Sequence, residues 1–130
     1  MSNRLKVLIV EDEVFTAKYL SENLADLNVD ALPPVPMGEQ AVEVALKELP
    51  DLILMDIRLA GGMDGIEAAQ AIQEHEMIPI VFMSAYAPDY ITEKAKVVNY
   101  MTFLEKPIIV EQLEPILKEI SEGNDSSGRG

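Results

Sequence analysis

Two patterns of apolar residues alternate along the chain. Short runs rich in Val, Ile and Leu are typical of buried strands. Each run is followed by a longer segment with apolar residues every three or four positions, which predicts an amphipathic helix. The runs are LKVLIV at 5–10, VDAL at 29–32, LILM at 52–55, IPIVFM at 78–83 and YMTFL at 100–104.

This alternation predicts an α/β fold, because parallel strands need crossover connections, which are usually helices. Pro33, Pro34 and Pro36 directly follow the second strand. Proline cannot donate to a ladder, so we expect this strand at an edge of the sheet. The prediction is a doubly wound, five-stranded parallel sheet in the order 2-1-3-4-5, with five helices.

The C-terminal helix contains Pro115 within its apolar period. An interior proline costs roughly 3 kcal/mol. The helix therefore either starts near Gln112 or starts near Val110 with a distorted first turn, and we expect the second. The last residues, GNDSSGRG, have no apolar side chain. We expect one folded domain at 1–122 and a disordered tail at 123–130.

Composition narrows the class of protein. The 130 residues include no cysteine, which excludes disulfides and thiolate metal sites. The formal net charge of −13 disfavours direct binding to nucleic acid. The apolar runs are too short to span a bilayer or to form a signal peptide. We expect a cytoplasmic protein without membrane contact.

Polar side chains follow four of the predicted strands. Glu11 and Asp12 follow the first strand, Asp56 the third, Ser84 the fourth and Lys106 the fifth. The carboxyl ends of parallel strands share one edge of the sheet, so these groups are expected to meet. Carboxylates about 4 Å apart repel by roughly 4 kcal/mol at an effective dielectric of 20, and a bound cation relieves this repulsion.

Oxygen ligands in this arrangement suit Mg²⁺. Together with a lysine and a hydroxyl, they predict a site for a phosphoryl group, with Asp56 as the nucleophile beside the loose loop 60–62. A helix N-cap at Glu11 and Asp12 and a turn at Asp56 are the structural alternatives. The ordered set of five groups favours function.

The chain from about Leu5 to Ser121 resembles the receiver domain of two-component response regulators. The motifs that carry the resemblance are VLIVEDE at 7–13, DLILMDIRLAGGMDGIEAA at 51–69, IPIVFMSAYA at 78–87 and FLEKP at 103–107. The resemblance implies a flavodoxin-like fold. It also implies that a sensor histidine kinase or a phosphotransfer protein donates a phosphoryl group from phosphohistidine, with Mg²⁺ as the cofactor.

By resemblance, Asp56 is the phosphoacceptor and also a metal ligand. Asp12 would bind Mg²⁺ directly, Glu11 mainly through water, and Arg58 through its backbone carbonyl. Lys106 would form an ion pair with the phosphoryl group.

Two further residues would report the phosphoryl group to the rest of the domain. Ser84 would close on it with a hydrogen bond, and Phe103 matches the aromatic residue that then turns inward.

The resemblance further implies a signalling switch that catalyses only its own phosphoryl transfer and dephosphorylation. The surface of the fourth helix, fifth strand and fifth helix would change and control a downstream protein or a fused output domain. A homodimer through this surface is plausible by resemblance.

Three segments depart from the family pattern. Phe103 stands where tyrosine is common, and residues 98–100, Val-Asn-Tyr, replace a Gly-Ala pair. The loop at 60–62 lacks a proline and is expected to be more mobile.

Alternative functions remain open on the residues alone. One is an interaction module that signals without phosphate, against which the intact site residues argue. Another is a receiver segment from a hybrid histidine kinase. A haloacid-dehalogenase-type phosphatase would need a second acid at position 58, where this chain has Arg58.

Overall fold

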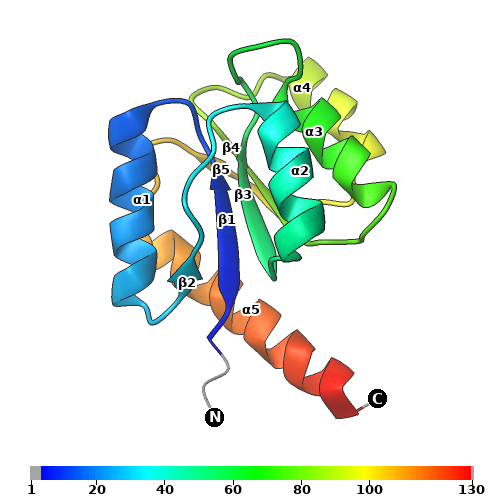
Figure 1. The fold of residues 1–130 in the computed structure, drawn as a ribbon. Helices are drawn as coiled ribbons and strands as arrows, with labels where there is room; N and C mark the ends of the chain where they lie inside the picture. The colour runs from blue at the N-terminus through cyan, green and yellow to red at the C-terminus, as the bar shows by residue number, and fades with distance from the viewer. Residues whose placement is uncertain (1–3, 130) are drawn as a thin grey trace.

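All five strands lie in one parallel sheet, in the order β2-β1-β3-β4-β5 (Figure 1). The structure is a computed structural model that describes residues 4–129. The strands are β1 (Lys6–Val10), β2 (Asp30–Ala31), β3 (Leu52–Asp56), β4 (Ile80–Ser84) and β5 (Thr102–Glu105). The predicted fold class and strand order are confirmed.

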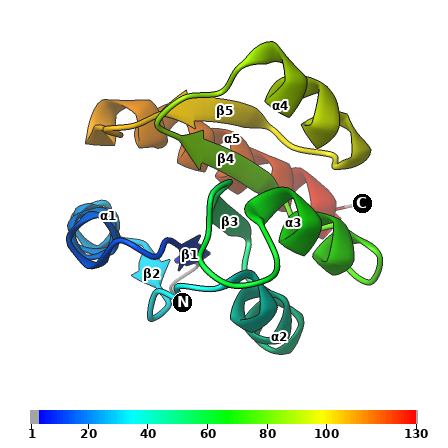
Figure 2. The ribbon, with the colours of Figure 1, turned by 90° about the horizontal axis from the view of Figure 1, so that it is seen from above.

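Helices cover both faces of the sheet, as the alternating pattern predicts (Figure 2). The helices are α1 (Val14–Asp26), α2 (Gly38–Glu48), α3 (Gly65–Gln73), α4 (Asp89–Lys94) and α5 (Val110–Arg129), with a 3₁₀ turn η1 (Ala95–Val97) after α4. Among the described residues, none of these helices is long and apolar enough to cross a bilayer.

The core consists of two apolar layers, one on each face. Alternate strand residues such as Ile53 and Phe82 pack with α2, α3 and the α4–η1 segment. The intervening residues, such as Leu54, pack with α1 and α5. Strands β1, β3 and β4 are buried on both faces and therefore read as continuous apolar runs.

The second strand is shorter than the sequence predicts. Only Asp30 and Ala31 pair with β1. The chain then stays beside β1, because the amide of Val35 donates to the carbonyl of Ile9. Pro33 and the residue after it have no N–H group and cannot continue the ladder. The second strand is therefore an edge strand of minimal length.

Helix α4 is short and ends at Lys94, where the 3₁₀ turn η1 follows it. Helix α5 starts at Val110 as predicted, with Pro115 inside it.

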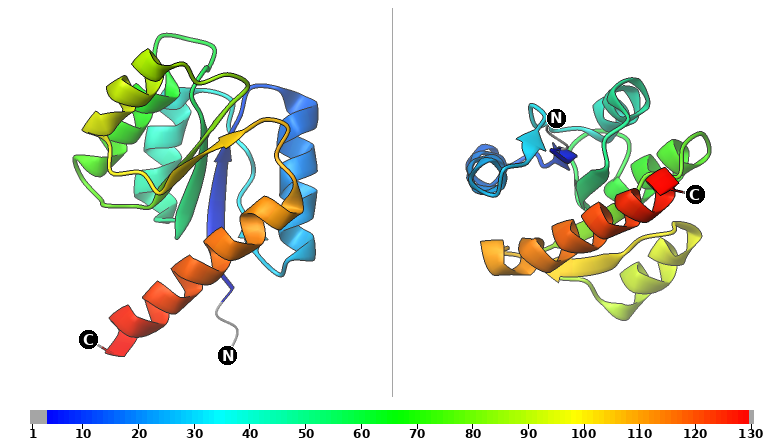
Figure 3. Two further views of the ribbon diagram at one scale, coloured as in Figure 1. Left: turned by 180° about the vertical axis from the view of Figure 1, so that it is seen from behind. Right: turned by 90° about the horizontal axis from the view of Figure 1, so that it is seen from below.

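Helix α5 continues through the predicted tail to Arg129 and extends past the sheet (Figure 3). Once a helix has formed, each further residue adds one backbone hydrogen bond. Amino-acid composition alone does not take this extension into account. Residue 130 lies outside the described residues, and the domain boundary at residue 122 stays a prediction.

Gly65 places α3 directly against the end of β3. Its amide donates to the carbonyl of Ile57 over 2.8 Å, and a Cβ at this position would lie 2.1 Å from the carbonyl oxygen of Asp56. Only glycine fits at this position, because the neighbouring backbone cannot move aside to accommodate a side chain. The first turn of α3 and the end of β3 therefore form one rigid unit.

We expect Gly65→Ala to lower the free energy of unfolding by about 2 kcal/mol, because overpacking forces the backbone to shift. Gly62→Ala is the matched control, since its Cβ would meet only a side-chain oxygen of Glu39 at 3.6 Å. Urea unfolding followed by circular dichroism measures both. Equal stability of the two variants would contradict this account of Gly65.

Candidate functional site

The candidate site lies at the carboxyl ends of β1, β3, β4 and β5. The register pairs Val10 with Met55 and Asp56 with Met83, so the first residues after β1 lie level with the end of β3. The amide of Lys106 donates to the carbonyl of Ser84 over 2.9 Å and extends the β4–β5 ladder into the site. The sheet therefore brings the predicted residues together, as the sequence analysis expects.

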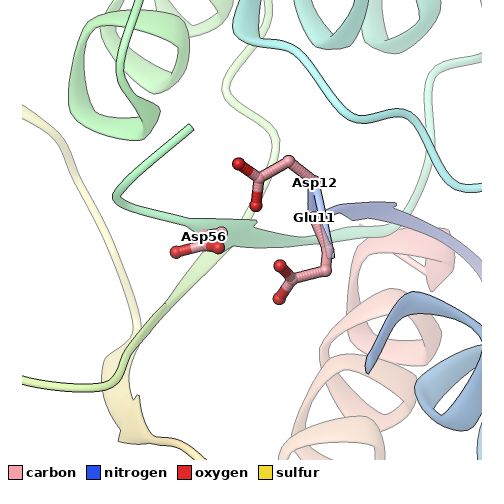
Figure 4. A group of neighbouring side chains, drawn as sticks. All are labelled: Glu11, Asp12 and Asp56. Atoms are coloured by element: carbon pink, nitrogen blue, oxygen red, sulfur yellow. The ribbon is translucent and has the colours of Figure 1, made fainter. Parts of the chain in front are cut away.

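Glu11, Asp12 and Asp56 form an acidic cluster (Figure 4). One carboxylate oxygen from each lies within 4.8 Å of the others. The Glu11 and Asp56 side chains are buried, whereas Asp12 is exposed. Two of the three carboxyl groups are thus inside the protein and the third is at its surface.

Lys106 holds the two buried carboxylates. Its Nζ lies 2.6 Å from Oε1 of Glu11 and 2.8 Å from Oδ2 of Asp56. Burial lowers the pKa of the Lys106 ammonium, but its close contacts and charge interactions with both carboxylates outweigh burial and raise it. The amine therefore stays protonated at neutral pH and offsets part of the crowded negative charge.

Glu11 is the member of the cluster whose buried charge is least well compensated. Its Oε2 accepts a hydrogen bond from the amide of Glu13 over 3.0 Å. Its Oε1 contacts the Lys106 ammonium but has no hydrogen-bond partner of acceptable geometry among the described residues. Burial, together with the charge of Asp56, raises the pKa of Glu11 from 4.5 to about 7, against the lowering effect of Lys106.

Asp56 faces a cleft of about 250 Å³. Its Oδ1 accepts a hydrogen bond from the amide of Arg58 over 3.1 Å, which places the backbone of Arg58 at the site. The residues that line the cleft are Asp56, Arg58, Ser84, Ala85, Tyr86 and Lys106. The cleft leaves room beside the Asp56 carboxylate for a group of the size of a phosphate.

A family model described as the response regulator receiver domain matches residues 7–118. The chain belongs to the response regulator receiver family. This receiver domain is a signalling module of two-component systems.

One curated relative and two solved structures illustrate what this chain is similar to. PdtaR, a transcriptional regulatory protein of Mycobacterium tuberculosis, is 33% identical over 113 residues, which are 87% of this chain and 55% of PdtaR. The receiver domain thus spans about half the length of this curated relative.

Two solved structures share the fold. The signal receiver domain of a modulated diguanylate cyclase from Desulfovibrio desulfuricans G20 has a TM-score of 0.87 and 31% identity, over 96% of this chain and 99% of that one. The receiver domain of a sensor histidine kinase from Pseudomonas aeruginosa PAO1 has a TM-score of 0.81 and 30% identity, over 91% and 98%. The second holds a magnesium ion in its active site cleft.

The acidic cluster of this receiver domain fits a divalent cation on its own chemistry. It offers oxygen ligands only, which a hard cation such as Mg²⁺ prefers. The buried Oε1 of Glu11 contacts only the Lys106 ammonium and lacks a hydrogen-bond partner of acceptable geometry among the described residues, and the raised pKa of Glu11 shows that Lys106 only partly offsets its burial. A cation at the cluster would relieve both.

Ser84 and Phe103 lie near the site without contacting the cluster through any hydrogen bond in the described part of the chain. The Ser84 hydroxyl donates to the carbonyl of Tyr86 over 2.7 Å and accepts from the amide of Tyr86 over 3.2 Å. The ring of Phe103 is partly buried beside Phe82 and Tyr100. The Ser84 hydroxyl therefore bonds to the backbone of its own loop while Ser84 lines the same cleft as Asp56.

The loop after Asp56 is tethered, a feature that the sequence analysis missed. Ala60 forms a parallel bridge with Met37, just before α2. A Cβ at Gly38 would lie 2.9 Å from the carbonyl oxygen of Met63, so α2 begins in close contact with the same loop. The glycines at 61 and 62 predict a mobile loop. The backbone pairing that holds the loop involves a distant segment and therefore leaves no local pattern in the sequence.

The raised pKa of Glu11 predicts a specific pH dependence of stability. The folded state keeps the Glu11 proton up to about pH 7, whereas the unfolded state loses it near pH 4.5. The metal-free receiver domain therefore loses stability as pH rises across this window, by roughly 2 kcal/mol from this residue. Glu11→Gln should remove that loss, so the variant gains on the wild type between pH 5 and 8.

Urea unfolding in the presence of a chelator, at several pH values, measures the difference between the two proteins. Glu119→Gln, at an exposed position on α5, is the control and should follow the wild type. A difference in stability between the wild type and Glu11→Gln that stays constant with pH would rule out a raised pKa at Glu11.

Proposed function

We propose that this receiver domain is a phosphoacceptor switch in which Asp56 takes a phosphoryl group from a phosphohistidine. The donor is a sensor histidine kinase or a phosphotransfer protein. The observation that carries the proposal is the position of the Asp56 carboxylate, which borders an open cleft and contacts at 2.8 Å the Lys106 ammonium that lines the same cleft. Membership of the receiver family supports the same reaction.

In the proposed reaction, a carboxylate oxygen of Asp56 attacks phosphorus in line with the leaving imidazole. The P–N bond breaks, and an acyl phosphate forms on Asp56. Bound Mg²⁺ would supply positive charge that neutralises the phosphoryl oxygens. The Arg58 amide, at 3.1 Å from Oδ1, orients the carboxylate before attack.

Lys106 and the acidic residues hold the reacting groups. Glu11, Asp12 and Asp56, with the backbone carbonyl of Arg58, are the proposed metal ligands. The Lys106 ammonium would give up a contact with a carboxylate and form an ion pair with a phosphoryl oxygen instead. The ammonium would need to move only slightly to do so. The protein thus catalyses only its own phosphorylation and dephosphorylation.

The switch would start at Ser84. Its hydroxyl would leave Tyr86 and donate to a phosphoryl oxygen on Asp56, which gives the phosphorylated state a contact that the structure does not contain. Phe103 would then turn inward, and the surface of α4, β5 and α5 would change. This surface would control a downstream protein or a fused output domain.

An apolar surface beside the site supports a protein donor. Val14 and Phe15, at the start of α1, are 74% and 80% exposed. A groove of about 370 Å³ runs from Phe15 and Tyr19 to Lys106, where it reaches the reacting residues. We propose that a helical domain carrying the phosphohistidine docks here, which would bring its imidazole to the cleft.

The first prediction from this proposal concerns the acceptor. Incubation with Mg²⁺ and a small phosphodonor such as acetyl phosphate should label the wild type, and Asp56→Asn should take up no label, because an amide cannot form the acyl phosphate. Asp26→Asn, at an exposed position at the end of α1, should label as the wild type does. Phosphate-affinity electrophoresis measures the labelled fraction, and labelling of Asp56→Asn at the wild-type level would refute the proposal.

The second prediction separates docking from chemistry. Phe15→Ala should slow transfer from a phosphorylated histidine phosphotransfer domain by roughly tenfold, because exposed aromatic anchors contribute strongly to docking. Labelling by acetyl phosphate should stay at the wild-type rate.

Leu49→Ala is the matched control, since Leu49 is 52% exposed and follows α2, away from the α1 surface. It should leave both rates unchanged. If Phe15→Ala slows both donors equally, or neither, the α1 surface is not the docking site.

A further inference from the structure

Helix α4 buries less of itself than the other helices of the domain. It has six residues, and none of them is buried, whereas α3 places Ile66, Ala69 and Ile72 in the core. Pro88, at the N-cap of α4, supplies no side-chain hydrogen bond to the first turn. Figure 2 shows α4 at the outer edge of the fold. Isolated helices shorter than about 12 residues are marginal in water, so α4 depends on what attaches it to its neighbours.

The segment that contains α4, residues 89–98, has few attachments to the rest of the protein. Its apolar anchors are the partly buried Ile91 and the buried Ala95 and Val98, the last two of which lie after the helix. Among the described residues, one ion pair joins this segment to another element, with Nζ of Lys94 3.2 Å from Oδ2 of Asp64. The ion pair between Lys96 and Glu93 lies entirely within the segment and moves with it.

Asp64 is a fixed point for the Lys94 ammonium. It is the N-cap of α3, where its Oδ1 accepts a hydrogen bond from the amide of Glu67 over 2.8 Å. The Glu67 side chain in turn accepts from the amide of Asp64 over 2.9 Å. The next residue, Gly65, packs against the end of β3. One carboxylate oxygen of Asp64 therefore caps α3, and the other is held in place for Lys94.

We propose that the Asp64–Lys94 ion pair is a tether that holds α4 to the first turn of α3 and limits how often residues 89–98 open. The two side chains are 32% and 52% exposed, so the pair contributes little to global stability. In a segment with so few attachments, however, a small contribution changes the local opening directly. Loss of the pair should raise the open population roughly 1.5- to fivefold.

Hydrogen exchange followed by NMR measures this opening, because a protected amide exchanges when its segment opens. The probes are the backbone amides of residues 92–98, such as that of Ala95, which donates to the carbonyl of Ile91. Amides that continue the sheet, such as that of Ile57, report global unfolding. The domain is measured without Mg²⁺ and without a phosphodonor.

Two single variants remove the tether from either end. Lys94→Met removes the ammonium and keeps most of the side-chain volume. Asp64→Asn removes the carboxylate charge but can still cap α3, since asparagine and aspartate are about equally good N-caps. In each variant the probe amides should exchange roughly 1.5- to fivefold faster, with the sheet amides unchanged. The double variant should exchange no faster than the faster single variant, because the second substitution removes a group that is already unpaired.

Lys47→Met is the matched control, because it makes the same change in net charge at an exposed position of α2. Its probe amides should exchange as those of the wild type do. Salt gives a second readout that a packing role of the Lys94 side chain would not produce. An increase from about 0.1 M to about 1 M sodium chloride shortens the Debye length from about 10 Å to about 3 Å. The difference between the wild type and Lys94→Met should therefore shrink.

Equal exchange of the probe amides in the wild type and both single variants would overturn the tether. Additive effects in the double variant, an equal acceleration in Lys47→Met, or a difference that salt leaves unchanged would overturn it as well. Equal acceleration of the sheet amides would show global destabilisation and lead to the same conclusion. The inference does not depend on the proposed function, since none of these measurements involves phosphorylation of Asp56.

Discussion

One ammonium group between two buried carboxylates is the interaction on which the site depends. Lys106 lies within 2.8 Å of both Glu11 and Asp56. Removal of Lys106 would leave two buried negative charges side by side, and its presence still leaves Glu11 with a pKa raised to about 7 by burial. The positive charge of Lys106 therefore does not fully offset the buried carboxylates, and a cation at the site would offset the remainder.

The sheet maintains this unfavourable arrangement because each charged group is anchored through its backbone. The amide of Glu11 donates to the carbonyl of Val35, that of Ile57 to Met83, and that of Lys106 to Ser84. These bonds continue the strand ladders past their last apolar residues. Burial of the apolar strands thus fixes the positions of the charges, and the stability of the core offsets their repulsion.

The sequence predicts most of this site because its signals are local. An apolar run that ends in Glu11, Asp56 or Lys106 marks the end of a strand, and the topology of a parallel sheet gathers those ends. The features that it does not predict depend on contacts between distant segments. The sequence around Ala60 does not predict its bridge to Met37. The sequence analysis therefore expects a more mobile loop than the structure shows.

The contacts of Tyr100 and the extent of α5 beyond residue 122 depend in the same way on more than the local composition. Tyr100 is visible in the sequence only as a departure from a Gly-Ala pair, and the backbone before it is bound by the side chain of Gln73, which lies 26 residues before Asn99. The polar composition after residue 122 favours disorder, whereas the structure continues α5 to Arg129. Composition describes the average behaviour of a segment and not its attachment to a preceding helix.

The close seat of α3 has a consequence for how information leaves the acceptor. Gly65 lies directly against the Asp56 carbonyl, so α3 has no free space on this flank of Asp56. On the other flank, the Ser84 hydroxyl bonds to the backbone of its own loop and Ser84 borders the same cleft as Asp56. Under the proposed function, a change at Asp56 would therefore pass toward β4 and β5 rather than into α3.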